Sequence, residues 1–208
     1  MALMEKVNKK RLHLGCGPVY LEGYINIDAK GELASKNLEL VEENKTILDK
    51  YYKNPYVKRI LGHNKRGRIV VDIKADILKL PFKENSIDEI LTVNVIDHLR
   101  LQDFPIAIKE WHRVLKPGGS LIIDVGDCVA NAEMMVEASK AHDENESLEW
   151  ALRLMYCHGR DKYDCHHWGY TPSYLGDLLA PYGFRSKWVR RNYIKHVYPA
   201  FQLCVDKR

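Results

Sequence analysis

The chain has 208 residues, a formal net charge of +4 at pH 7, and ordinary contents of hydrophobic and charged residues, 46% and 29%. These values predict one globular domain over residues 1–208 and exclude a membrane protein, because no stretch approaches ~18 consecutive apolar residues. Five scattered cysteines argue against a disulfide framework, and the charged start lacks the apolar run of a secretory signal, so we expect a reduced, cytoplasmic protein.

The first predicted unit is a strand, a glycine turn and a second strand within residues 11–28. The strands cover 12–14 and 24–27, and Gly15-Cys16-Gly17 separates them. Two glycines spaced by one residue at a strand end allow a sharp turn and leave no Cβ in the way of a ligand. Asp28 closes the second strand, where a carboxylate can accept hydrogen bonds from ribose hydroxyls. A tight turn without a ligand is the alternative explanation of the glycines.

A charged segment over residues 31–67 is interpreted as a helical insertion between core elements. Apolar residues at helical spacing predict a helix over 32–52, Asn54-Pro55 interrupts it, and 56–61 add a turn or two. Residues 45–68 carry eight basic side chains against one acid, and 185–208 carry seven against one. These basic segments are either contacts for an anionic partner or solvated surface.

Three strands and a helix are predicted between residues 68 and 125. The β-branched run 68–73 is a buried-strand pattern, and Asp76 follows it directly. A strand over 87–95 carries Asn94 near its end. The next helix begins after Asp103, a suitable N-cap, and ends at the Lys116–Gly119 breaker, before a strand over 120–125.

The rest of the chain is predicted to contain a long helix, a loop, a short helix and two strands. Their ranges are 130–155, 156–171, 172–179, 184–190 and 201–206. Because strands alternate with helices over most of the length, the fold class is an α/β layered sheet, mostly parallel. Ligands bind such sheets outside the carboxyl ends of the strands, where the glycine turn and the acids lie.

Several segments match, in order, the motifs of one enzyme family. LHLGCGP is similar to its glycine motif, INID to its second strand with the ribose-binding acid, and ADILKLPFKENSIDEI to its adenine-side motif. VNVIDHL and EWHRVLKPGGSLIIDV match the following segments, and HHWGYTPSYLGDLLAPYGF matches a subgroup of short bacterial members. The chain thus resembles a class I S-adenosylmethionine-dependent methyltransferase. The resemblance implies a Rossmann-like, doubly wound, mostly parallel seven-stranded sheet with helices on both faces.

Two features depart from the family's pattern. Only about ten residues separate Gly17 from Asp28, too few for the usual crossover helix, and the short subgroup shares this truncation. Asp97 stands where a glutamate is usual, which puts a ribose or methionine contact from that position in doubt.

The resemblance implies that S-adenosylmethionine is the cofactor and that residues at the strand ends bind it. These residues are Gly15, Cys16, Gly17, Asp28, Asp76, Ile77 and Asn94. The backbone of the glycine turn would approach the methionine part, and Asp28 would accept both ribose hydroxyls. Asp76 would accept from the adenine amino group, Ile77 N–H would face a ring nitrogen, and Asn94 would contact the methionine end. The alternative for the two acids is that they stabilise turns.

Region 130–182 and the segment after Asn94 are expected to form the acceptor side of the site. Methyl transfer to an oxygen or nitrogen atom of the acceptor can need a general base. We expect His98 or His167 in this role, with His166 as a further candidate; the alternative is ordinary hydrogen-bonding histidines. Cys157-His158 and Cys165-His166-His167 raise a metal site, but their spacing does not match the usual ligand motifs. The sequence therefore predicts no metal.

The leading hypothesis is a methyltransferase for a small-molecule or sugar acceptor. The basic segments leave an anionic acceptor open, whereas nucleic acid is disfavoured because no N-P-P-Y tetrad is present. One alternative is a non-catalytic S-adenosylmethionine-binding domain that acts through a partner. The other is a nicotinamide-dependent oxidoreductase, against which the missing third glycine and the Asp76 motif count. The oligomeric state cannot be read from the sequence.

Overall fold

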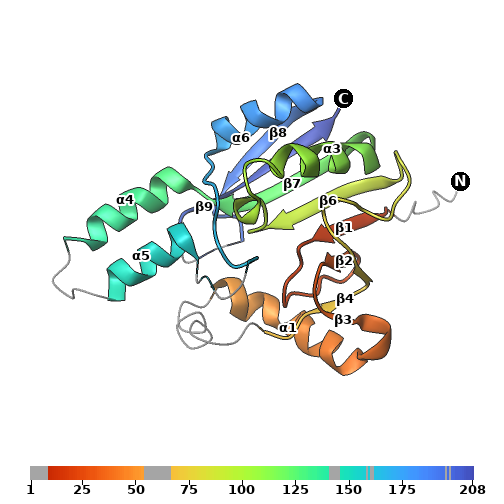
Figure 1. The fold of residues 1–208 in the computed structure, drawn as a ribbon, viewed down its shortest axis with the longest axis horizontal. Helices are drawn as coiled ribbons and strands as arrows, with labels where there is room; N and C mark the ends of the chain where they lie inside the picture. The colour runs from red at the N-terminus through yellow and green to blue at the C-terminus, as the bar shows by residue number, and fades with distance from the viewer. Residues whose placement is uncertain are drawn as a thin grey trace, which may run out of the picture.

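A computed structural model describes residues 9–53, 67–140, 146–157, 159, 162–194, 196 and 198–208. Its main sheet has seven strands in the order β5-β2-β1-β6-β7-β9-β8 (Figure 1). β9 runs antiparallel to both neighbours, and every other neighbouring pair is parallel. The strands are β1 Arg11–Leu14, β2 Ile25–Asp28, β5 Ile73–Lys74, β6 Ile87–Val93, β7 Leu115–Gly126, β8 Phe184–Arg191 and β9 Ala200–Lys207. The predicted Rossmann-like, doubly wound, mostly parallel sheet is confirmed.

The winding of the sheet reverses between β1 and β6, because β2 and β5 lie on one side of this pair and β7, β9 and β8 on the other. In open α/β sheets, ligands bind in the crevice outside the carboxyl ends of the strands at such a point. The glycine turn follows β1, and Asn94 follows β6. The topology therefore places both at the edge where a ligand is expected.

The main core lies between one face of the sheet and helices α3 (Phe104–Val114) and α6 (Pro172–Leu179). Alternate residues of the strands point into it, as Leu12 and Leu14 of β1 do, and both are fully buried. Trp111 of α3 is also fully buried, and truncation of an aromatic side chain at such a site costs about 3–5 kcal/mol. The short helix η3 (Ala180–Tyr182) follows α6 and leads into β8.

A smaller set of apolar contacts lies on the opposite face, beneath helix α1 (Leu38–Lys53). Ile47 of this helix packs against a cluster built on Val19 and Val93. Along β6, Ile90 belongs to the main core and Val93 to this smaller cluster. The two side chains therefore lie on opposite faces of the sheet. A two-stranded parallel sheet of β3 (Glu32–Leu33) and β4 (Val70–Val71), with the short helix η1 (Ala34–Lys36), completes this segment.

Two elements of this segment differ from the prediction. The helix expected over 32–52 begins only at Leu38, because residues 32–33 pair with β4 and the Asn37 side chain accepts a hydrogen bond from Leu40 N–H at 3.0 Å. The strand expected over 68–73 is split into β4 and β5 at Asp72, whose carboxylate accepts the Asn26 N–H at 2.7 Å. The helical turn expected over 56–61 lies outside the described residues.

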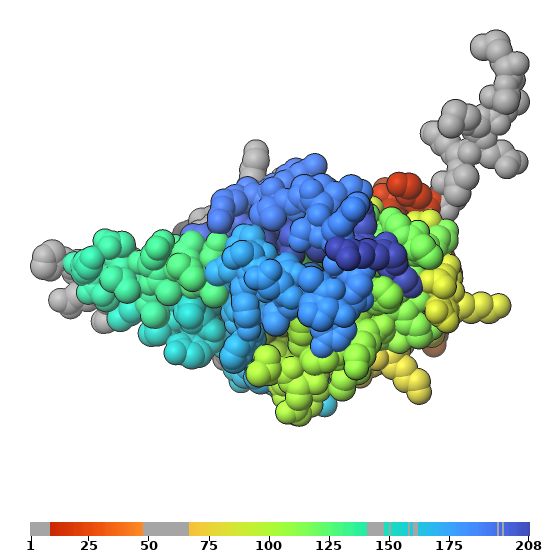
Figure 2. Space-filling view, turned by 90° about the horizontal axis from the view of Figure 1, so that it is seen from above, coloured from red at the N-terminus to blue at the C-terminus, as the bar shows by residue number. Residues whose placement is uncertain are grey.

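The helix expected over 130–155 is in fact two helices, α4 (Cys128–Ala138) and α5 (Glu146–Tyr156), which pack against each other. α4 ends where Ser139 N–H donates to the carbonyls of Met135 and Glu137. The pair extends from one end of the molecule as a projection (Figure 2). Within the described chain, no helix combines the length and apolar character that a membrane crossing requires.

Residues 116–119 were predicted to separate the helix from a strand that begins at residue 120. They belong to that strand instead, because β7 begins at Leu115. Ile87 of β6 pairs with Leu115, whereas Glu89 pairs with Ser120. The residues between Leu115 and Ser120 therefore bulge out of the ladder, and Gly118 adopts φ +74° there. Ahead of α3, the short helix η2 (Ile96–His98) connects it to β6.

Candidate functional site

The glycine turn lies at the carboxyl end of β1, beside the point where the winding reverses. Gly15 and Gly17 have φ values of +62° and +54°, which glycine adopts without steric cost. A Cβ on Gly15 would stand 2.6 Å from Val95 Cγ2, whereas one on Gly17 would meet no heavy atom of the described residues within 4 Å. Packing therefore requires glycine at position 15, and position 17 leaves open space in which a ligand can approach the backbone.

Cys16 contributes its backbone to the turn rather than a reactive thiol. Its side chain is buried, and its N–H donates to the Ile27 carbonyl at 3.1 Å. Burial raises the pKa of the Cys16 thiol, so the sulfur stays protonated at neutral pH.

Asp28 connects the glycine turn to the end of β2. Its Oδ2 accepts the Gly17 N–H at 3.1 Å, and its Oδ1 accepts the Lys30 N–H at 3.0 Å. The side chain is half-buried. A carboxylate oxygen can accept two hydrogen bonds, so each oxygen retains capacity for a hydroxyl group of a ligand.

Asp76 lies on the loop after β5, next to Asp28. Ala75 N–H donates to the Asp28 carbonyl at 3.1 Å, which extends the pairing of β2 with β5 to the start of this loop. Asp76 is exposed, and its Oδ1 accepts the Leu78 N–H at 2.9 Å. The two acids therefore occupy neighbouring strand ends, while Ile77 and Leu78 beside them are half-buried.

Side chains of helix α3 hold the loop that carries Asp76. Trp111 Nε1–H donates to the Ile77 carbonyl at 2.9 Å, and Glu110 Oε1 accepts the Leu80 N–H at 2.7 Å. Arg113 pairs with Glu110 at 2.7 Å, and this hydrogen bond lowers the pKa of the Glu110 carboxyl. The sequence could not indicate the contact of Trp111 with Ile77, because helical periodicity carries no information on where a ring N–H points.

Asn94 follows β6 with φ +52°, a strained value for a residue with a side chain. Its Nδ2 donates to the Tyr198 hydroxyl oxygen at 2.7 Å. The ring of Tyr198 stacks on His196 with centroids 4.7 Å apart, and His196 Nε2 lies 2.7 Å from Asp124 Oδ1. Burial raises the pKa of Asp124. No motif in the sequence indicated that Tyr198 and His196 reach this edge of the sheet.

The two histidines predicted as candidate bases have different surroundings. His98 is half-buried, its Nδ1 lies 3.1 Å from the Cys165 carbonyl, and burial lowers its pKa. Its ring is 4.7 Å from that of His166, nearly perpendicular to it. His167 is exposed, and its backbone N–H donates to the Asp97 carbonyl at 2.7 Å. The structure thus places the ring of His98 against His166, the further candidate.

A cavity of about 250 Å³ lies between α4, α5 and the loop over residues 166–169. It adjoins the carboxyl ends of β6 and β7, since Asp97 and Gly126 belong to its lining. Other lining residues include Cys128, Asn131, Met155, His166 and Trp168. The mixture of apolar, amide, imidazole and indole groups is typical of a pocket for a small organic molecule.

Comparison with known proteins gives consistent matches. A family model described as a methyltransferase domain matches residues 12–123. The Mus musculus protein named "Probable tRNA methyltransferase 9B" is 39% identical over 75 residues, which are 36% of this chain and 16% of that protein. The chain spans 40% or less of the length of the curated relatives that it matches first.

Two solved structures share the fold. A SAM-dependent methyltransferase of Methanosarcina mazei has a TM-score of 0.55 and 19% identity, covering 95% of this chain and 92% of that one. The 1,6-didemethyltoxoflavin-N1-methyltransferase of Burkholderia thailandensis, with 1,6-didemethyltoxoflavin and S-adenosylhomocysteine bound, has a TM-score of 0.54 and 13% identity, covering 97% and 72%. At these identities the likeness concerns the fold alone.

Proposed function

Because the chain belongs to the methyltransferase domain family, we propose that it transfers a methyl group from S-adenosylmethionine to a small-molecule or sugar acceptor. The observation that carries this proposal is the linked pair of acids, Asp28 and Asp76, at neighbouring strand ends beside an open glycine turn. One acid contacts the turn through Gly17 N–H, and Ala75 N–H connects its backbone to the loop of the other. This arrangement suits a nucleoside held at both its sugar and its base.

The residues at this edge fit the parts of the donor. Asp28 would accept from the ribose hydroxyls with the capacity left on its two oxygens. Asp76 would accept from the adenine amino group and Ile77 N–H would donate to a ring nitrogen, on a loop that α3 holds in place. The backbone of Gly15, Cys16 and Gly17, together with Asn94, would contact the methionine end. When bound, the donor supplies an electrophilic methyl group, and the protein's task is to align the acceptor with it and exclude water.

The acceptor would bind in the cavity beside α4 and α5. Its volume of about 250 Å³ lies below the range of roughly 300–1,000 Å³ for drug-sized ligands, which favours a small acceptor. For an oxygen or nitrogen acceptor, His98 and His167 are the two candidates for removing a proton. At the carboxyl end of β8, on the cavity's side of the sheet, the exposed Arg190 and Arg191 favour an acceptor that carries negative charge.

The proposal is tested in two stages on the purified chain. Calorimetry should show binding of S-adenosylmethionine and S-adenosylhomocysteine, no binding of a nicotinamide dinucleotide, and loss of donor binding in the Asp28→Asn/Asp76→Asn double variant. An absence of binding at millimolar donor would refute the activity.

Transfer of labelled methyl from the donor should then be followed with a panel of anionic sugars and small metabolites, with tRNA as a separate arm because of the named relative. Label found only in tRNA would contradict the proposed acceptor class. Donor binding with no transfer to any acceptor would favour the non-catalytic alternative.

A further inference from the structure

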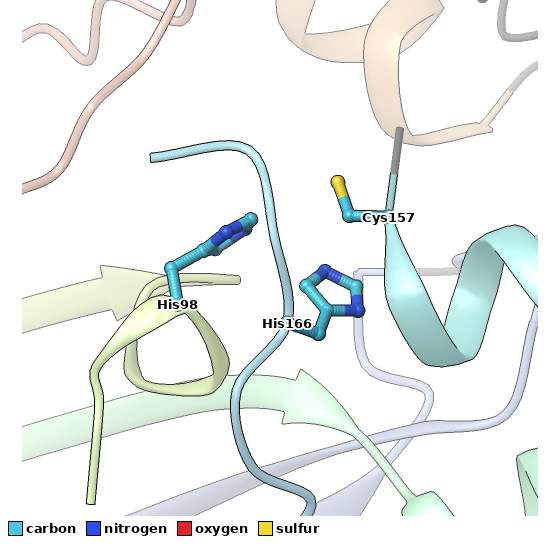
Figure 3. A group of neighbouring side chains, drawn as sticks. All are labelled: His98, Cys157 and His166. Atoms are coloured by element: carbon cyan, nitrogen blue, oxygen red, sulfur yellow. The ribbon is translucent and has the colours of Figure 1, made fainter. Parts of the chain in front are cut away.

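Three side chains that can bind a metal ion converge beside the cavity: His98, Cys157 and His166. They come from η2, the end of α5 and the loop after residue 164, and they face a common space (Figure 3). Their ligand atoms lie within 4.8 Å of one another, and all three residues are half-buried. A cluster of two imidazoles and one thiol has the donor types that zinc prefers.

The hydrogen bonds of the two imidazoles leave Nε2 of each ring available. His98 Nδ1 lies 3.1 Å from the Cys165 carbonyl, and His166 Nδ1 lies 2.9 Å from the Leu154 carbonyl. A carbonyl oxygen only accepts, so each Nδ1 carries the hydrogen, and a neutral ring then has its lone pair on Nε2. Metal-binding histidines are commonly oriented in this way, by donating the other ring N–H to a backbone carbonyl.

The buried carboxylate of Asp97 lies beside His166, and a positive charge at this position would stabilise it. Asp97 is 7% exposed, and its Oδ1 has no hydrogen-bond partner among the described residues. Its Oδ2 lies 3.4 Å from His166 Nε2. With the hydrogen on Nδ1, the lone pair of Nε2 faces a carboxylate oxygen, and a cation bound to both atoms would stabilise this arrangement. Two ligands of one tetrahedral zinc ion are ~3.4 Å apart, given metal–ligand distances of about 2.0–2.1 Å.

We propose that His98, His166 and Cys157 bind a divalent metal ion of the zinc class, with the carboxylate of Asp97 beside it. Binding would exchange the thiol proton of Cys157 for the metal and release that proton to solvent. The thiol hydrogen bond to Asp164 Oδ1, at 3.2 Å, would be given up in the exchange. The thiolate and the Asp97 carboxylate together balance the two positive charges of the ion, and the buried carboxylate of Asp164, 3.2 Å from the sulfur, adds a further negative charge beside it.

The sequence predicted no metal site because the spacing of possible ligands within residues 157–167 does not match the usual motifs. His98 precedes Cys157 by more than fifty residues in the sequence, so no short motif includes it. An ion at this place would tie the end of α5 and the loop after residue 164 to η2. It would also occupy the Nε2 lone pair of His98, and proton removal from an acceptor would then fall to another group.

Metal binding is measured on the full chain without donor or acceptor, so the result is independent of the proposed function. The protein is stripped with a chelator and titrated with Zn²⁺ in competition with a chromophoric chelator. We expect one ion per chain, and at least tenfold weaker binding in each of His98→Gln, His166→Gln and Cys157→Ser. Asp97→Asn should weaken binding by about 10–100-fold, as expected for a group beside the ligands.

Matched controls separate this site from general effects of substitution. Cys128→Ser, in the cavity lining, and His112→Gln, whose ring packs on Phe184 with centroids 5.3 Å apart, should bind Zn²⁺ as the unchanged chain does. Co²⁺ should give a thiolate charge-transfer band in the unchanged chain that is absent in Cys157→Ser, and circular dichroism verifies that each variant is folded.

The proposal is overturned if the unchanged chain shows no saturable Zn²⁺ binding. That outcome would leave the Asp97–His166 contact without a bridging cation. Unaltered affinity in all three ligand variants would equally overturn it.

Discussion

The donor-side edge of the candidate site, formed by the ends of β1, β2 and β5, is held by hydrogen bonds between side chains and the main chain, from Asp28 to the glycine turn and from α3 to the Asp76 loop. The acceptor-side cavity is enclosed by side chains from α4, α5 and the loop over 166–169. At the donor edge, Asp28 contacts a turn only eleven residues away in sequence. At the cavity, by contrast, His98 meets the carbonyl of Cys165, sixty-seven residues away.

This difference coincides with the extent of the match to the family model. Residues 12–123, which match the family model, include every residue assigned to the donor. The cavity and the cluster of His98, Cys157 and His166 depend mostly on residues beyond that range. Donor binding and acceptor choice should therefore respond to different substitutions, and four experiments can test how independent the two sides are.

The largest effect is expected from Gly15→Ala on the donor side. The added Cβ would stand 2.6 Å from Val95 Cγ2 at a φ of +62°, combining backbone strain of about 1–2 kcal/mol with overpacking of about 1–3 kcal/mol. Gly17→Ala meets open space and should cost only the strain. Urea unfolding of the two variants measures the difference in free energy of unfolding. Equal losses would show that Val95 moves aside at little cost.

Asp28→Asn should reduce affinity for S-adenosylhomocysteine by about 10–100-fold, because a hydrogen bond to a charged group contributes about 1.5–3 kcal/mol. Asp76→Asn should have a smaller effect, since Asp76 is exposed. Glu22→Gln, which alters an exposed acid in the connection between β1 and β2, serves as the control. Calorimetry gives all three affinities, and an Asp28→Asn variant that binds as tightly as the control would remove the assigned ribose contact.

Lowering the pH should reduce the free energy of unfolding through His13, a buried residue of β1 on the donor side. Burial lowers the pKa of His13 to about 4 from its ordinary 6.5, and its ring contacts Asn26 of β2 at 3.1 Å. The unfolded chain binds a proton at higher pH than the folded one, so stability is full above pH 6.5 and is lost as the pH falls toward 4. We expect a loss of about 1–2 kcal/mol at pH 5. Denaturant unfolding at pH 7 and pH 5 measures it, and His13→Gln should flatten the dependence.

Trp168→Ala should have the smallest effect on the donor and a selective one on the acceptor. Trp168 lines the cavity and is 40% exposed, so its loss should raise the acceptor KM several-fold. Affinity for S-adenosylhomocysteine should stay within about twofold of the unchanged chain, because none of the assigned donor contacts involves this residue. A tenfold loss of donor affinity would mean that the two sides of the site are not separable.

The sequence by itself determined the sheet and the donor-side edge. The first two strand patterns, the glycine turn and Asp28 all lie within residues 11–28, and their arrangement follows from local backbone preferences and the alternation of buried residues. Asp76 could be assigned to the same edge because parallel strands end on the same side. The family motifs cover this part of the chain, so pattern and resemblance led to the same residues.

Only the tertiary structure decided which distant side chains support or extend this edge. Trp111 reaches Ile77 because α3 packs across the sheet, and Tyr198 reaches Asn94 because β9 inserts between β7 and β8. His98, Cys157 and His166 meet because α4 and α5 are two helices where periodicity predicted one. Hydrophobic periodicity sets which face of an element is buried, but it carries no information on which polar groups from separate elements will meet once those faces have packed.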